Sequence, residues 1–181
     1  MFTIVKDNKP SLRERCKEVE MPLKEELKAT LDEMLQYLKD SQDEEFLKKH
    51  PNVRSGVGIA APQIGLNLRM LAIYYVDEEG NEVIHQLVNP KIIVSSLKKC
   101  YLYSGEGCLS VDGEHHGRVY RDFRITVKAF DCRKGEETTF KAKGYEAIVL
   151  QHEIDHLNGI LFYDHIDKNN PDKEIPGAIA I

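Results

Sequence analysis

Two histidines four residues apart constrain this chain more than any other feature of its sequence. They stand in the run Gln151-His152-Glu153-Ile154-Asp155-His156. In a helix, residues four apart lie one turn above each other on the same face. Two neutral imidazoles so placed can bind one divalent ion, and a glutamate beside the first can reach a water molecule on that ion. The run therefore predicts a metal site on a helix, with a third ligand from elsewhere in the chain.

The composition limits the kind of protein that can carry such a site. Of 181 residues, 41% are hydrophobic and 30% are charged, so we expect one soluble domain over residues 1–181. The net charge of −5 argues against nucleic-acid readout. No apolar run is long enough to span a membrane, and the first ten residues contain no secretory signal. We expect a cytoplasmic protein without membrane contact, whose cysteines 16, 100, 108 and 132 are thiols.

The order of the apolar patterns predicts an α+β fold, with antiparallel sheets around a central metal-binding helix that carries the histidine pair. Leucines at helical spacing predict an N-terminal amphipathic helix from Pro22 to about Lys39. A short helix is expected to start at 43–45 and to end by 50–52. Pro90 is expected to interrupt the strands, and helical spacing runs from 145 to 157. The strands are expected at 68–76, 83–88, 92–94, 100–103, 123–130, 138–142 and 161–166.

Two further stretches bear on the missing ligand. The small residues of 56–65 would let another backbone approach closely, either a neighbouring strand or an extended peptide substrate. Cys108 follows Gly107 and is one candidate for the third ligand, while Glu174 in the polar tail is another. The metzincin pattern of zinc endoproteases fails because position 162 is phenylalanine. A Cys-His-His site with a bound water is consistent with Zn²⁺ or Fe²⁺.

Three motifs in this chain resemble those of the peptide deformylase family. They are the segments 56–63, 106–110 and 151–156, which occur in the family's order. The extra residues at 40–55 and the lack of a long C-terminal helix make the chain similar to the second type, typical of Gram-positive bacteria. The resemblance implies a hydrolase of protein biosynthesis, which removes the formyl group from the N-terminal formylmethionine of newly made polypeptides and releases formate.

The resemblance also implies a role for individual residues. Cys108, His152 and His156 would bind the metal, natively Fe²⁺, with Zn²⁺ or Ni²⁺ in isolated protein. Water on that metal would attack the formyl carbon, with Glu153 as general base and then acid. The Gln63 side-chain amide and the Leu109 backbone N–H would stabilise the oxyanion. The pocket for the methionine side chain would be formed by Val57, Gly58, Glu106, Tyr145, Ile148 and Val149.

Two other functions are compatible with the residues alone. A zinc endoprotease would take Glu174 or another downstream ligand and would tolerate Cys108→Ser. A metal-stabilised binding module, for instance one associated with the ribosome, would release no formate. For the hydrolase, the expected partners are N-formylmethionyl nascent chains, with transient ribosome contact. We also expect an ion pair between Glu106 and Arg121, whereas histidines 115, 116 and 165 should be exposed or structural.

Overall fold

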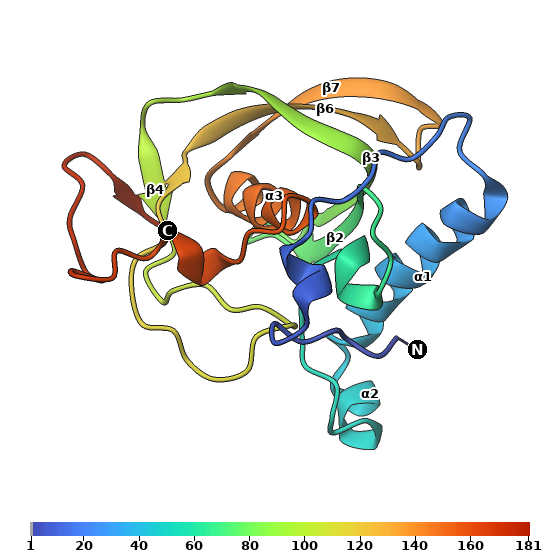
Figure 1. The fold of residues 1–181 in the computed structure, drawn as a ribbon, viewed down its shortest axis with the longest axis horizontal. Coiled ribbons are helices and arrows are strands. Elements are labelled where there is room, and N and C mark those ends of the chain that lie inside the picture. Colours follow the sequence, from blue (N-terminus) through green and yellow to red (C-terminus); the bar gives the residue numbers. More distant parts are fainter. Residues whose placement is uncertain (1) are drawn as a thin grey trace.

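The protein, described here for residues 2–181 by a computed structural model, is built around the helix α3 (Gly144–Leu157). Figure 1 shows α3 near the middle of the molecule, with the long strands arching over it. Short 3-10 helices occupy Pro10–Arg13, Ala61–Ile64 and Phe162–His165. The other elements are α1 (Glu25–Asp40), α2 (Glu44–Lys49), β1 (Gly58–Ala60), β2 (Met70–Val76), β3 (Glu82–Ser95), β4 (Lys99–Tyr101), β5 (Arg121–Asp122), β6 (Arg124–Asp131), β7 (Glu136–Lys143) and β8 (Ile179–Ala180).

The larger sheet has five antiparallel strands in the order β1-β2-β3-β6-β7. Side chains alternate across a strand, so β2 buries two sets of residues. Leu71 and Ile73 pack in the cluster that includes Leu150 of α3. Met70 and Ala72 pack on the other face, in the cluster formed with leucines of α1. Because both faces are covered, β2 is almost continuously apolar, and α1 and α3 lie on opposite sides of the sheet.

The prediction that Pro90 interrupts the strands was wrong. Strand β3 continues through this proline to Ser95, so 92–94 is not a separate strand. Pairing with β2 ends at Val88, and the pairing with β6 shifts register between Val88 and Lys91. Asn89 has a positive φ of 52° at this point. A proline lacks the N–H of a regular ladder, but a bulge tolerates it, and here the bulge bends β3 toward the second sheet.

The second sheet differs from the expectation of purely antiparallel pairing. Its order is β5-β4-β8, and β8 from the chain's tail lies parallel to β4, with Cys100 opposite Ile179. The strand predicted at 161–166 is a 3-10 helix instead, and the Asp164 carboxylate caps it by accepting a hydrogen bond from the Leu161 N–H at 2.9 Å. The short predicted helix is α2, and the Asp43 side chain caps it by accepting a hydrogen bond from the Phe46 N–H at 2.7 Å.

Helix α1 is amphipathic and begins at Glu25, three residues later than predicted. Leu31, Met34 and Leu38 are buried against the sheet, while the charged side chains of the helix face solvent. Within residues 2–181, no helix combines the length and the apolar composition that crossing a membrane requires.

Candidate metal centre

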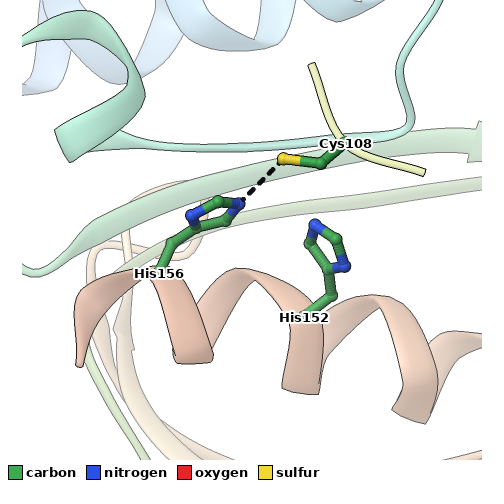
Figure 2. Close-up of side chains that lie close together, drawn as sticks. All are labelled: Cys108, His152 and His156. Carbon is green, nitrogen blue, oxygen red and sulfur yellow. Dashed lines mark hydrogen bonds between the residues drawn. The ribbon is translucent and has the colours of Figure 1, made fainter. Parts of the chain in front are cut away.

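Three side chains from two distant segments converge beside α3. Figure 2 shows His152 and His156 rising from consecutive turns of α3 toward Cys108, which lies in the loop between β4 and β5. Their donor atoms lie within 4.8 Å of one another, and the Cys108 sulfur is 3.3 Å from the His156 Nε2. Tetrahedral ligands at ordinary bond lengths lie about 3.5 Å apart. The three donors therefore fit one divalent ion, and one thiolate with two imidazoles suits Fe²⁺, Zn²⁺ or Ni²⁺.

A buried ion-pair network holds His152 from behind. The Glu106 carboxylate lies 2.8 Å from the His152 Nδ1 and accepts hydrogen bonds from the Arg121 guanidinium at 2.9 and 3.0 Å. Arg121 also pairs with Asp155 on α3. Burial alone would raise the pKa of Glu106, but hydrogen bonds from His152 and Arg121 outweigh it and lower the pKa to about 2. The ionised carboxylate holds the proton on Nδ1 and leaves Nε2 free to bind a metal.

Glu153 is buried with one carboxylate oxygen unpaired. Its side chain lines the cavity described below, and Oε2 has no hydrogen-bond partner among residues 2–181. Burial raises the pKa of Glu153 to about 7. A β-carbon added to Gly58 would lie 2.3 Å from the Glu153 Oε1. Gly58 pairs with Ile73 of β2, but the lack of a side chain at position 58 makes room for this carboxylate.

The Gln63 amide is oriented toward the sulfur of Cys108. Its Oε1 accepts a hydrogen bond from the Ala60 N–H at 2.8 Å, which leaves the amide NH₂ on the other side. Nε2 donates to the Ser110 hydroxyl at 3.1 Å and lies 3.5 Å from the Cys108 sulfur. Leu109 follows Cys108 directly, and its side chain packs on Gly56. The Gln63 amide therefore borders the candidate metal site as a hydrogen-bond donor, and Leu109 lines the adjoining cavity.

A cavity of about 250 Å³ opens beside these residues. The six predicted pocket residues all line it, together with Gln63 and Glu153. The Glu106 carboxylate, however, is directed at Arg121 and His152, so it supports the site instead of contacting what enters the cavity. The Tyr145 ring is fixed by an edge-on contact with Tyr75, at a centroid distance of 5.0 Å. The cavity is thus a recess with both apolar and polar walls, and two of the candidate metal ligands, Cys108 and His152, line it.

Other candidate ligands lie away from this site. The Glu174 carboxylate is exposed and pairs with Arg118 at 3.5 Å, and the cluster of donors among the described residues does not include it. Neither Glu174 nor any other described residue downstream of His156 belongs to the cluster, so the endoprotease interpretation lacks the ligand it required. His115, His116 and His165 are all exposed, and His165 pairs with Asp155 at 2.7 Å, at the outer end of the network that supports His152. The ion pair predicted between Glu106 and Arg121 is present.

The sequence did not predict some residues of the site. Asp155 and Ser110 lie inside the motifs, so their position next to ligands could have drawn attention to them. Arg54 and Leu102 also line the cavity, but nothing in their local sequence distinguishes them from other surface residues. Such contacts arise only when distant segments fold together.

Comparison with known proteins decides the family. The family model described as polypeptide deformylase matches residues 1–172, nearly the whole chain. The chain belongs to the peptide deformylase family. A relative named peptide deformylase, from Macrococcus caseolyticus, is 53% identical over 182 residues, which cover 100% of this chain and 98% of that protein. Peptide deformylase 2 of Bacillus subtilis is 49% identical over 181 residues, covering 100% and 97%.

Solved deformylase structures share the fold. The peptide deformylase of Thermotoga maritima aligns with a TM-score of 0.71 at 34% identity, covering 92% of this chain and 98% of that one. A plant deformylase, from Arabidopsis thaliana, aligns with a TM-score of 0.74 at 32% identity, covering 93% and 83%. The α+β arrangement of antiparallel strands and a few helices is therefore that of the deformylase family, and the resemblance to the second type agrees with the Bacillus relative.

Proposed function

We propose that this deformylase removes the formyl group from the N-terminal formylmethionine of newly made polypeptides and releases formate. The observation that carries the proposal is the convergence of the Cys108, His152 and His156 donor atoms beside the unpaired Glu153 carboxylate. We further propose that residues 1–181 form one catalytic domain that works in the cytoplasm, where formylated nascent chains leave the ribosome.

Cys108, His152 and His156 would hold the ion, Fe²⁺ in the native enzyme and Zn²⁺ or Ni²⁺ after isolation. Such an ion would act as a Lewis acid and make a water molecule acidic enough to react near neutral pH. Metal identity is not fixed by this ligand set, since all three ions accept a thiolate with two imidazoles.

Glu153 would take a proton from the attacking water and deliver it to the leaving amine. A carboxyl with a pKa of about 7 is suited to both steps, because it can accept and release a proton near neutral pH. The Gln63 amide N–H and the Leu109 backbone N–H would donate to the oxygen of the formyl group as it gains negative charge. The fixed direction of the Gln63 amide supports this role, since its NH₂ already faces the Cys108 side of the site.

The methionine side chain would occupy the cavity. Val57, Tyr145, Ile148 and Val149 offer it an apolar lining, and an unbranched thioether adapts to such a recess. The backbone of Val57 and Gly58 lies along the same cavity, where an extended peptide could pair with it as an added strand.

Formate release from a formyl-Met peptide tests the proposal, with protein prepared anaerobically and its metal content measured. We expect the Glu153→Ala variant to keep its metal and lose formate release. Gln63→Leu should lower kcat roughly 10²–10³-fold. Wild-type activity in Glu153→Ala, or cleavage of internal peptide bonds, would contradict the proposal.

A further inference from the structure

A buried arginine at the C-terminal end of α3 has no role in the site described above. Arg69, just before β2, is only 5% exposed. Burial lowers the pKa of its guanidinium, so its surroundings must compensate for a desolvated charge. The ion pairs formed by residues 2–181 do not include Arg69. A buried cation without a carboxylate partner is costly unless other groups satisfy its N–H donors.

The Arg69 guanidinium binds the end of the helix that carries both histidines. Nη1 donates to the Leu157 carbonyl oxygen and to the Asn158 Oδ1, each at 3.0 Å, and Nη2 donates to the Pro90 carbonyl at 3.5 Å. The last carbonyls of a helix carry partial negative charge and lack partners within the helix. The planar fork of an arginine can hold several such acceptors at once, which the point charge of a lysine cannot.

The same carbonyl is held from a second side. The Cys16 N–H donates to the Leu157 oxygen at 2.9 Å, and the Arg69 N–H donates to the Lys17 carbonyl at 2.9 Å. The backbone that carries the guanidinium is thus tied to the N-terminal arm, the segment 2–20. His156 directly precedes Leu157, so the place of the last turn of α3 sets the place of the His156 ring.

We propose that Arg69 is a positioning residue, which fixes the last turn of α3 and thereby the His156 imidazole relative to the Cys108 sulfur. The inference rests on the proposed function only in that these two residues bind the metal ion. It predicts that loss of the guanidinium loosens the metal site beyond any general loss of stability.

Release of Co²⁺ to excess EDTA tests this proposal. Co²⁺ is loaded anaerobically, and the thiolate-to-cobalt absorption band reports the Cys108 bond directly. We expect Arg69→Met to lose the ion roughly 10–100-fold faster than the wild type, the range typical when support of a ligand is removed. Arg69→Lys should be intermediate, since it keeps the charge but not the fork. The control is Leu31→Ala, a buried residue of α1 on the other side of the sheet, which should lower the unfolding temperature and leave the release rate unchanged.

Three results would overturn the inference. The first is release from Arg69→Met at the wild-type rate. The second is equal acceleration in Leu31→Ala, because the effect would then be one of stability alone. The third is release of Co²⁺ from Arg69→Lys at the wild-type rate. This result alone overturns the inference if the Arg69→Met variant does not fold. If the wild type itself fails to bind Co²⁺, the proposed function falls and this inference with it, which differs from a failure confined to Arg69.

Discussion

At the scale of the residue, Gly58 in β1 leaves the room that the carboxylate of the candidate general base, Glu153, occupies. A methyl group at Gly58 would collide with the Glu153 carboxylate, at 2.3 Å from Oε1, and both groups are buried. We predict that Gly58→Ala keeps its metal but lowers kcat by roughly 10²-fold, because small displacements of a catalytic group have effects of this size. Steady-state kinetics with parallel metal analysis measure this. An unchanged kcat would mean that the position of the carboxylate is unimportant.

The carboxylate behind His152 gives a second prediction at this scale. Glu106→Gln removes the charge that pairs with Arg121 and orients the imidazole. We expect metal affinity to fall roughly 10–100-fold, as measured by Co²⁺ titration against a competing chelator. The matched control is Glu174→Gln, whose exposed carboxylate pairs only at the surface and should leave the affinity as it is. Equal affinity in all three proteins would contradict the assigned support.

Some parts of this site could be predicted from the sequence alone and others could not. The spacing of His152 and His156 is local, so a helix places them together by geometry. The residues alone left Cys108 and Glu174 as candidates for the third ligand, and resemblance to a family selected Cys108. The structure brings Cys108 and the two histidines together. Glu106 was expected both to pair with Arg121 and to line the pocket. The pairing with Arg121, at the start of β5, directs its carboxylate away from the cavity, and no local pattern indicates which of the two roles prevails.

At the scale of the element, the end of α3 is closed by contact with the N-terminal arm. Gly159 has a φ of +72°, and a β-carbon there would lie 2.3 Å from the Arg13 carbonyl oxygen. Gly135 has the same φ, in the turn between β6 and β7, with nothing within 4 Å. Gly135→Ala should therefore cost about 1–2 kcal/mol of stability, the left-handed penalty alone. We predict a clearly larger loss for Gly159→Ala, measured by urea unfolding. Equal losses of stability in the two variants would show that the N-terminal arm moves aside at no cost in free energy.

Helices and strands were predictable where the residues of one segment determine its structure without a distant partner. The leucine stripe of α1 and the cap of α2 needed no distant partner. β3 was mispredicted at Pro90 because the bulge depends on where its pairing with β2 ends. The sequence did not predict β8, because a strand of two residues is too short to show an alternating pattern. Only its pairing with β4 identifies it.

At the scale of the whole molecule, buried thiols should make the free energy of unfolding fall at alkaline pH. Burial raises the pKa of Cys16 and of Cys100 to about 11, from an ordinary value of 9.0. The unfolded chain therefore releases these protons at lower pH than the folded protein does. The free energy of unfolding should be constant with respect to these thiols below pH 9 and should fall as the pH rises from 9 to 11.

Urea unfolding at pH 8 and pH 10.5 measures this fall. The double variant Cys16→Ala/Cys100→Ala should start from a lower stability at pH 8, because two buried side chains are shortened, but should lose less of it at pH 10.5. The same loss in wild type and variant would show that other groups govern the alkaline transition.

Two of the three candidate ligands stand on a rigid helix, while the sulfur comes from a loop without regular structure. For ions that differ in radius, His152 and His156 would keep their places on that helix. Adjustment to a larger or smaller ion would then fall to the backbone around Cys108. Structures of the enzyme loaded with iron, nickel or zinc should superimpose along α3 and diverge at that loop.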